Sequence, residues 1–362
     1  MKKILKFVSR FLLVVNLLTA ILLVCCAYSP MLPAAKMPLL SLAGLAFPFV
    51  LAVNVLFRVF WLIAYWRYAF VSLVTFLICF VQIRAFFPIN AIGQFPPKNS
   101  LKVLSYNILS SNITSSNTNK GNATIAYLEA ADADIICLQE LQFATLKKHK
   151  ELLKKYPYKS YNLSNDSQAA AHHLACLSKY PIIDSKKIEL KSTSNGCTKY
   201  HILYEGDTIV VYNCHLQSNG LQKEDKSTYK LFLTNPLEYM DNKGTEDTKN
   251  LIKKLRDSAA KRAAQADVIL ADMEKETSPY IIVCGDFNDS PISYTCHRLK
   301  EQLDDAYIGS GNGPGISYNR HGMYYRIDHI LHSPQFKAYG CTVDRSIKIS
   351  DHYPIFCFLE KR

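Results

Sequence analysis

The sequence predicts an α/β protein with more sheet than a simple doubly wound fold, preceded by an N-terminal transmembrane helical region of about three spans. Two observations lead to this prediction. All 30 Asp and Glu residues lie after residue 100, whereas the first 100 residues hold nine of the 42 Lys and Arg residues among long apolar runs. After residue 100, short β-type runs that end in polar residues alternate with helical patterns, which is typical of mixed α/β domains.

The N-terminal region contains three apolar runs, near residues 7–28, 37–57 and 68–88. A helix that crosses the hydrocarbon core, which is about 30 Å thick, needs roughly 20 mostly apolar residues. The first two runs reach this length, and the third reaches it only if the residues up to 88 are included. Aromatic side chains gather between the second and third runs, as at a membrane interface; they are Trp61, Tyr65, Trp66 and Tyr68.

A cleaved signal peptide is the alternative interpretation of residues 1–28. The basic start and apolar centre fit it, but no small-x-small cleavage site follows, and two further apolar runs do. We therefore predict a protein integral to the inner (cytoplasmic) membrane, with residues 1–88 as its anchor and residues 89–100, rich in Pro and turn formers, as a linker. Basic segments stay in the cytoplasm, so three spans would place residues 101–362 on the extracytoplasmic side. That side inverts if the third run does not span.

The net charge of +12 arises mainly in the N-terminal part, so the remainder shows no strong bulk charge for nucleic-acid binding. The cysteines of the sequence indicate neither the cellular compartment nor a disulfide pairing. Eight of the eleven cysteines lie after residue 100, several inside apolar β-type runs, and no CxxC or Cys/His zinc spacing occurs. Such cysteines are typical of small core residues.

Strand-like runs in the soluble part are predicted at 101–108, 133–141, 173–183, 208–216, 280–287, 325–333 and 352–360. Helical spacing of apolar residues predicts helices over 122–131 and 245–276. Six of the strand-like runs begin or end beside a residue that can bind a metal ion or move a proton. These residues are Asn107, Glu140, His215, Asp286 with Asn288, Asp328, and Asp351 with His352.

One acidic residue beside a strand is ordinary, whereas six strands that deliver such side chains indicate one common site. Hard oxygen ligands with few nitrogens suit Mg²⁺ better than zinc, with Mn²⁺ as a substitute. Asp351 and His352 are neighbours, so an extended chain would point their side chains to opposite faces and give them different roles. Plainer alternatives remain for most of these residues: turn chemistry at Asn107, Asp286 and Asn288, a surface position for Glu140, and structural histidines at His215 and His352.

These residues belong to the motifs SYNI, LQE, HL, GDFN, RIDHI and SDHYP, which follow one another in residues 101–362. Their order resembles the endonuclease/exonuclease/phosphatase superfamily with the DNase I-like fold, and the three-span N-terminus resembles a membrane-anchored bacterial type. The resemblance implies a four-layer α/β sandwich, in which two β-sheets are flanked by helices and the site lies at one sheet edge. It also implies that residues 101–362 form a catalytic domain that cleaves phosphoric esters with Mg²⁺.

The resemblance further implies residue roles. Glu140, with Asp351 and Asn107 nearby, would hold the metal ion. Asp286 would align or deprotonate the attacking water, and Asn288 would bind a phosphate oxygen without repelling it.

Two histidines complete the implied site. His352 would reach the scissile phosphate, with Asp328 accepting the other ring N–H and fixing the tautomer. His215 would contact phosphate or protonate the leaving oxygen, although other branches of the family carry tyrosine there. Asp289 is assigned to the turn and Arg262 to support of the site loops. Arg326 is either a phosphate neighbour or part of a strand-edge ion pair, and the role of His173 stays open.

The sequence thus predicts a membrane-anchored, Mg²⁺-dependent phosphohydrolase, and more specifically a phosphodiesterase or nuclease that uses metal-assisted in-line attack of water. A phospholipid or sphingolipid headgroup phosphodiesterase or phosphatase is the alternative, because a membrane anchor favours such substrates. A non-catalytic binding module is less favoured, since none of the six motifs is lost. The predicted partners are the membrane and a nucleic-acid or phospholipid substrate; no protein partner or oligomeric state is predicted.

Overall fold

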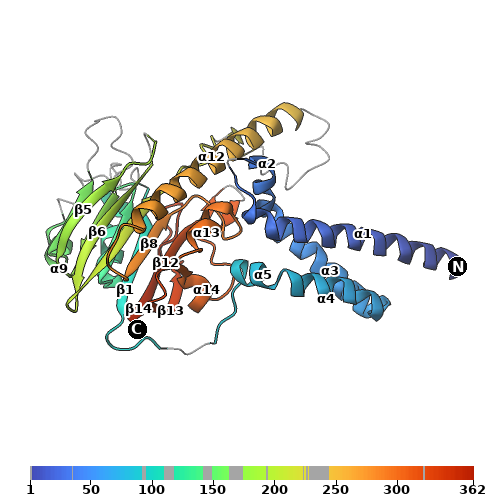
Figure 1. Ribbon diagram of the computed structural model, residues 1–362, viewed down its shortest axis with the longest axis horizontal. Coiled ribbons are helices and arrows are strands. Elements are labelled where there is room, and N and C mark those ends of the chain that lie inside the picture. The colour runs from blue at the N-terminus through green and yellow to red at the C-terminus, as the bar shows by residue number, and fades with distance from the viewer. Residues whose placement is uncertain are drawn as a thin grey trace.

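A computed structural model of the chain shows a bundle of N-terminal helices joined to a part with two packed β-sheets (Figure 1). The residues that the structure describes are 2–34, 36–91, 95–109, 118–141, 149–162, 174–192, 195–222, 224–225, 227, 244–320 and 323–362.

The bundle contains two helices that are long and apolar enough to cross a membrane, Lys6–Met31 and Leu39–Ala64. A bent pair, Trp66–Ile78 and Phe80–Phe86, would make a third if both halves belong to one span. The regular elements are α1 (Lys2–Tyr28), η1 (Ser29–Met31), α2 (Pro38–Ser41), η2 (Leu42–Ala46), α3 (Phe47–Ala64), η3 (Trp66–Tyr68), α4 (Ala69–Ile78) and α5 (Phe80–Phe86).

Buried polar side chains connect the helices of the bundle. Trp61 Nε1 donates to Asn16 Oδ1 at 3.0 Å, and Asn16 Nδ2 donates to Ser72 Oγ at 3.4 Å. Asn54 Nδ2 donates to the Thr19 carbonyl at 3.0 Å. Residues 16 and 19 of α1 thus meet residues 61 and 54 of α3, so α1 and α3 run antiparallel with α4 beside them. Hydrogen bonds of this kind hold helices together where apolar burial does not drive association.

The third apolar run differs from the single span expected over 68–88, because its helix bends by 70° between α4 and α5. No Pro or Gly lies between residues 66 and 87 to cause the bend. Instead, α5 turns onto the two-sheet part, where the Ala85 carbonyl accepts a hydrogen bond from Arg326 at 2.6 Å. Tertiary contact, which the local sequence does not encode, therefore sets the path of this segment.

The first sheet has the strand order β13-β14-β1-β2-β4-β3. All its neighbouring pairs are antiparallel except β1 and β2, which are parallel. The strands are β1 (Leu101–Asn107), β2 (Ile135–Gln139), β3 (Tyr158–Asn162), β4 (Leu174–Ser178), β13 (Phe336–Val343) and β14 (Ile355–Lys361).

The second sheet has the order β5-β6-β7-β8-β12-β9, with β7 and β8 as its parallel pair. Strands β10 and β11 form a separate two-stranded sheet. The strands are β5 (Ile182–Ile188), β6 (Gly196–Tyr204), β7 (Asp207–His215), β8 (Ile281–Asp286), β9 (Asp304–Asp305), β10 (Tyr318–Arg320), β11 (Met323–Tyr325) and β12 (Asp328–His332).

The central strands are buried on both faces, which explains their long apolar runs. Val103 and Val211 belong to the core between the sheets. Leu104, on the opposite face of β1, packs with the helices outside the first sheet, and Val283 packs with those outside the second. The covering helices are α7 (Thr118–Ala131) and α9 (Lys150–Lys155) on the first sheet, and α12 (Gly244–Met273) and α13 (Tyr294–Leu299) on the second, with α14 (Ala306–Ser310) near β12 and β13. The predicted arrangement of two mixed sheets flanked by helices is confirmed.

The predicted strand runs correspond to β1, β2, β4, β7, β8, β12 and β14, whereas β3, β6 and β13 were missed, although β6 is mostly buried. The run predicted at 173–183 is β4 followed by a turn and the start of β5. Strand β5 itself was not predicted, because residues 183–187 are exposed and carry three charged side chains. The predicted helix over 245–276 is α12.

Candidate active site

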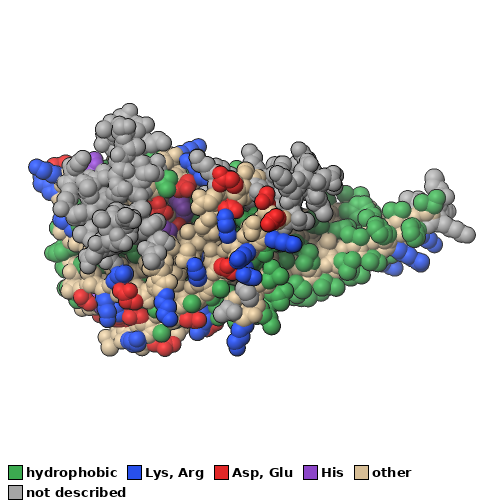
Figure 2. Space-filling view, turned by 90° about the horizontal axis from the view of Figure 1, so that it is seen from above, with side chains coloured by type: hydrophobic (Ala, Val, Ile, Leu, Met, Phe, Trp, Pro, Cys, Tyr) green, Lys and Arg blue, Asp and Glu red, His purple; other side chains and the backbone are tan. Residues whose placement is uncertain are grey.

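The parallel pairs of the two sheets bring polar strand ends to one edge. Asn107 ends β1 and Glu140 follows β2, while His215 and Asp286 end β7 and β8. Strand β12 runs antiparallel to β8, so it begins where β8 ends, and Asp328 is the register partner of Asp286. Figure 2 shows acidic and histidine side chains together in a hollow of the surface.

Asn107 connects the two sheets at this edge. Its Nδ2 donates to Glu140 Oε1 at 3.1 Å and to Asp286 Oδ2 at 3.0 Å. Its Oδ1 accepts the Leu109 N–H at 3.2 Å, which is consistent with the amide nitrogen facing the carboxylates. A neutral donor thus brings two carboxylates close together without adding a third negative charge.

Glu140 has the backbone and the exposure of a ligand-facing residue. Its φ is +55°, in the left-handed region that non-glycine residues seldom adopt, a kind of strain that gathers at functional sites. Its side chain keeps 20% of its surface exposed, whereas that of Asp286 keeps 2%. The Glu140 carboxylate is therefore the more accessible of the pair.

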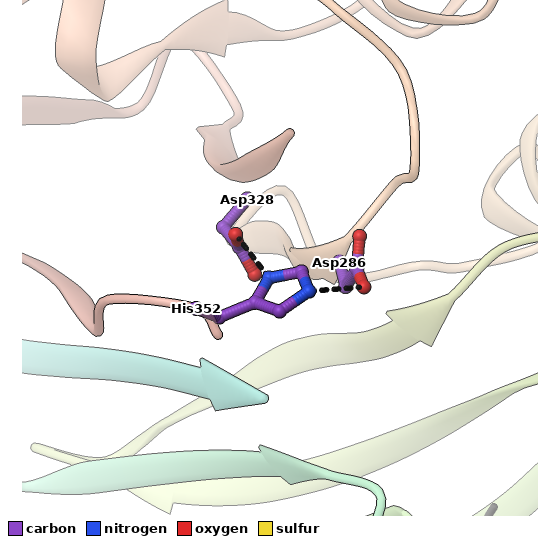
Figure 3. A group of neighbouring side chains, drawn as sticks. All are labelled: Asp286, Asp328 and His352. Carbon is purple, nitrogen blue, oxygen red and sulfur yellow. Dashed lines mark hydrogen bonds and ion pairs between the residues drawn. The ribbon is translucent and has the colours of Figure 1, made fainter. Parts of the chain in front are cut away.

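His352 lies between two buried carboxylates (Figure 3). Its Nδ1 donates to Asp328 Oδ2 at 2.8 Å, and its Nε2 lies 3.6 Å from Asp286 Oδ2. Burial by itself would lower the pKa of His352, but the carboxylates of Asp328 and Asp286 outweigh that effect and raise the pKa well above its usual value. The two carboxylates thus favour the protonated ring, and Asp328 fixes its orientation.

The surroundings of this pair are ordered by two serines and a tyrosine. Ser317 Oγ accepts the backbone N–H of Asp328 at 3.0 Å. Ser350 Oγ donates to the Asn107 carbonyl at 2.8 Å and accepts the His352 N–H at 3.1 Å. The Tyr318 ring packs edge-on against His352 at 5.1 Å. These supporting residues were not predicted, since Ser and Tyr in loops carry no sequence signal that separates them from ordinary turns.

His215 lies near both carboxylates that Asn107 holds. Its Nε2 is 3.8 Å from Glu140 Oε1 and 3.7 Å from Asp286 Oδ2, and the residue is 3% exposed. The structure therefore places His215 with Asn107, Glu140 and Asp286 in one group.

Asn288 occupies a tight turn after β8, with φ at +53°. Its backbone N–H donates to Asp286 Oδ1 at 2.8 Å, and its Nδ2 donates to the Leu216 carbonyl at 3.0 Å. One amide hydrogen is thus engaged with the end of β7. Asn288 can therefore form the turn and still bind phosphate, because its contact with the Leu216 carbonyl uses only one of the two hydrogens on Nδ2.

Asp351 is half-buried, and its Oδ1 lies 3.4 Å from Ser350 Oγ. Its backbone carbonyl accepts the Asn319 N–H at 3.3 Å. The side chains of Asp351 and His352 are thus engaged with different partners, as the adjacent positions suggested. These contacts do not test the metal-binding role that the sequence predicts for Asp351, so that role stays a prediction.

A divalent cation fits the residues present at this edge. Among the described His, Cys, Asp and Glu residues, Asp286, Asp328 and His352 have ligand atoms within 4.8 Å of one another. Both ring nitrogens of that histidine face carboxylates, one at hydrogen-bond distance and one at ion-pair distance, so we regard this set as an array held by the histidine. Glu140 and Asp286 converge on the Asn107 amide, and such carboxylates are the oxygen donors that Mg²⁺ prefers.

A buried polar contact fixes the two sheets near the site. Gln139 Nε2 donates to Asn213 Oδ1 at 2.7 Å, and Asn213 Nδ2 donates to the carbonyls of Leu138 and Ala175, both at 3.0 Å. Gln139 and Asn213 are fully buried. The sequence signal for this contact was an amide side chain within each apolar strand, which our sequence analysis did not use.

Arg262 of α12 supports the loops that follow β7 and β8. Its Nε donates to Asp289 Oδ2 at 3.0 Å, and its Nη1 donates to the Gln217 carbonyl at 2.9 Å and to Asn219 Oδ1 at 2.8 Å. The guanidinium is buried, at 3% exposure. These contacts agree with the supporting role expected for Arg262, and they give Asp289 a partner in addition to its turn.

Arg326 has neither of the two roles considered from the sequence. It is 1% exposed, its guanidinium stacks 4.4 Å from the centre of the Tyr307 ring, and it donates to the carbonyls of Pro314 and Ala85. It therefore joins the bundle to the two-sheet part. His173 lies outside the described residues.

The sequence was compared with known families and structures. The profile of the Endonuclease/Exonuclease/phosphatase family matches residues 104–352, and a domain of unknown function (DUF8431) matches residues 9–86. No curated protein sequence matches the chain.

Several solved structures share the fold at low sequence identity. Truncated TDP2 of Caenorhabditis elegans is 17% identical, with a TM-score of 0.51 over 72% of this chain and 97% of that one. TDP2 of D. rerio complexed with single strand DNA product is 16% identical, with a TM-score of 0.51 over 73% and 100%. The human Nocturnin catalytic domain with bound sulfate anion is 14% identical, with a TM-score of 0.51 over 74% and 97%.

Proposed function

We propose that this chain, which belongs to the endonuclease/exonuclease/phosphatase family, is a membrane-anchored, Mg²⁺-dependent phosphodiesterase that cleaves its substrate by in-line attack of water. One observation carries the proposal. The Asp328–His352–Asp286 array lies beside the Asn107–Glu140 pair, so a cationic donor and an oxygen-ligand set face the same small space.

The chemistry divides between these two groups. A bound Mg²⁺ would polarise a phosphate oxygen and neutralise developing charge. Glu140 is the principal ligand in this proposal, and Asn107 orients it against Asp286. Asp351, half-buried next to His352, is the further ligand that the family resemblance assigns.

The proton and the phosphate charge are handled by residues at the ends of β7 and β8 and by His352, which precedes β14. His352 donates from Nε2 to a phosphate oxygen, because Asp328 occupies Nδ1 and keeps the ring cationic. Asp286 accepts a hydrogen bond from the attacking water and aligns it, while Asn288 donates to a phosphate oxygen. His215 lies on the Glu140 side of Asp286 and contacts the leaving oxygen in this arrangement.

Membrane anchoring is supported by the length and apolar surface of α1 and α3. Packing and charge together support one side of the membrane for the catalytic part. The segment between α1 and α3 contacts α12 and α13 of the two-sheet part, whereas Lys6 and Arg10 start α1 at its other end. Arg67 lies in η3, beyond the same end of α3. Since basic ends stay in the cytoplasm, we place the catalytic part, residues 101–362, on the extracytoplasmic side.

The proposed side is the same whether or not the bent pair is a full span. Helix α1 alone connects the basic end to the segment that touches the catalytic part. The proposed boundaries are an anchor over residues 1–88 and a linker over residues 89–100.

Nucleic acid is the first substrate class we propose, since the D. rerio relative is described with a single strand DNA product. Phospholipid or sphingolipid headgroups are the second, because the anchor would hold the site near a lipid surface. The two classes separate in one assay of the purified full-length protein in detergent, with plasmid DNA, RNA, sphingomyelin and phosphoinositides as substrates.

The test of catalysis itself uses bis-p-nitrophenyl phosphate and Mg²⁺. We expect turnover that Glu140→Gln and His352→Gln each reduce by about 100-fold or more. Glu274→Gln, an exposed carboxylate at the end of α12, should keep wild-type turnover. Absence of turnover on every substrate, or full turnover in the Glu140 and His352 variants, would contradict the proposal.

A further inference from the structure

The loop that carries Asp286 continues into the core of the helical bundle. Six residues after Asp286, Ile292 is 3% exposed and packs in one cluster with Leu23, Ala27 and Phe47 of α1 and α3. The residues between them are almost all buried. The loop thus has the catalytic carboxylate at one end and a side chain held by the N-terminal helices at the other.

A glycine of η2 lies directly against the loop. A Cβ placed on Gly44 would lie 2.0 Å from the Ile292 carbonyl oxygen and 3.3 Å from its Cγ2. The carbonyl oxygen is a backbone atom, which cannot move aside as the end of a flexible side chain would. Glycine is therefore required at position 44 for the segment and the loop to meet as they do.

The same loop is held from its other sides by the catalytic part. Arg262 binds the Asp289 carboxylate at 3.0 Å, and the His329 ring donates from Nε2 to the Asp289 carbonyl at 3.0 Å. Lys300 Nζ lies 3.4 Å from the Pro291 carbonyl. Helix α12, which carries Arg262, itself contacts α2 and η2 (Figure 1). The N-terminal segment therefore reaches the loop directly through Gly44 and indirectly through α12.

A second contact between bundle and catalytic part lies away from the loop. Asn90 Nδ2 donates to the carbonyls of Ile308 and Gly311 at 3.1 and 2.6 Å, and its backbone N–H donates to Asn312 Oδ1 at 2.7 Å. The helical part and the catalytic part thus meet at this place as well as at Gly44.

We infer that the segment 38–46 is a positioning element of the active site, in which Gly44, seated on Ile292, fixes the loop 286–292 and through it Asp286. The anchor then helps to position an active-site residue and does more than hold the catalytic part at the membrane. The inference rests on the proposed function, because Asp286 must act in the reaction for its position to affect the rate.

The experiment compares full-length variants in detergent with bis-p-nitrophenyl phosphate and Mg²⁺. Gly44→Leu forces the segment off the loop, and we expect kcat to fall about 10- to 100-fold with KM changed less than threefold, as for a misplaced catalytic group. The matched control is Ala46→Leu, which places the same side chain at an exposed position of η2 and should keep wild-type kcat. Asn90→Ala, at the other contact, should also keep it.

Amide hydrogen exchange gives a readout that does not depend on activity. Residues 286–292 should exchange faster in Gly44→Leu and as in wild type in Ala46→Leu. If Gly44→Leu fails to fold, Gly44→Ala and Ile292→Ala test the same contact, with the same expected direction in kcat and exchange.

The outcomes separate the two proposals. An active wild type in which the folded Gly44 and Ile292 variants keep full kcat would overturn this inference alone. Equal losses in the Gly44→Leu and Ala46→Leu variants would also overturn it, since bulk anywhere in η2 would then have the same effect. A wild type with no turnover on any ester would overturn the proposed function, and this inference with it.

Discussion

Asn107 in the first sheet donates to the Asp286 carboxylate of the second sheet at 3.0 Å, across the junction of the two sheets. The same amide nitrogen holds Glu140 at 3.1 Å. Neither carboxylate would keep its position if the sheets packed differently, so the candidate site depends on sheet-on-sheet packing as much as on the strands themselves.

Removing the amide should therefore weaken the fold and expose the repulsion between the carboxylates. We expect Asn107→Ala to lower the free energy of unfolding by about 1–3 kcal/mol, because the hydrogen bonds to two buried or half-buried carboxylates are lost. Chemical denaturation of the full-length protein in detergent measures the change. Asn99→Ala, at an exposed position before β1, is the matched control and should stay within about 0.5 kcal/mol of wild type.

Asp328 should affect the rate through His352. Asp328→Asn keeps the size of the side chain but removes the charge that raises the pKa of His352 and can present the wrong hydrogen-bonding group to Nδ1. We expect kcat to fall by about 100-fold or more, with protein that remains folded by circular dichroism. Asp304→Asn, an exposed neighbour in β9, should leave kcat unchanged, and an equal loss in both variants would contradict the proposed role.

Mg²⁺ should stabilise the folded protein through Glu140. At a Mg²⁺ concentration about 100 times its dissociation constant, stabilisation of about 2.7 kcal/mol is expected, seen as a rise in melting temperature that EDTA reverses. Glu140→Gln should remove most of the rise, and Glu274→Gln should retain it. A rise that is the same in all three proteins would show that the ion binds elsewhere.

Stability should depend on pH through a buried pair next to the site, His329 and Asp305, whose Nδ1 and Oδ2 atoms lie 3.8 Å apart. Burial lowers the pKa of His329, but Cys296 and the Asp305 carboxylate outweigh it and raise the pKa to about 10. For Asp305 burial acts to raise the pKa, but the nearby His329 ring and the charge of Arg326 hold it below its usual value.

The signs of these shifts fix the pH window. The His329 contribution is complete below its unfolded pKa of about 6.5 and is lost as the pH rises through about 10. The Asp305 contribution is present above about pH 4 and is lost at lower pH. Unfolding measured from pH 5 to pH 10 should show a decline above pH 6.5 that His329→Gln flattens; an unchanged decline in that variant would assign it to other groups.

Arg262 of α12 should be essential for the positions of the loops that follow β7 and β8. Arg262→Met leaves Asp289 buried without its cation, a change that costs on the order of 3–5 kcal/mol. We expect a lower melting temperature together with a kcat reduced about tenfold or more, because the loops after β7 and β8 carry site residues. Lys261→Met, at an exposed position one residue earlier, should be neutral in both measurements.

At the candidate site, the residues at the strand ends could be predicted from the sequence, but the contacts among them could not. The polar ends of β1, β2, β7, β8 and β12 could be predicted, because each follows or begins an apolar run that is short enough to be a strand. The contacts among them could not, since residues 107 and 286 are 179 positions apart. Arg326 shows the same limit: its motif suggested a phosphate or an ion pair, whereas its partners belong to α5, α14 and the adjoining loop.

The sequence by itself determined the division into an apolar basic N-terminal region and a mixed α/β part, together with the residue types gathered at the strand ends. Periodicity, charge and motif order are local properties that a linear sequence carries. The bend at Cys79, the seat of Gly44 on Ile292 and the meeting of Asn107 with Asp286 were decided only by the tertiary structure. Each depends on which distant surfaces pack together, and packing is a property of the whole fold that no local segment specifies.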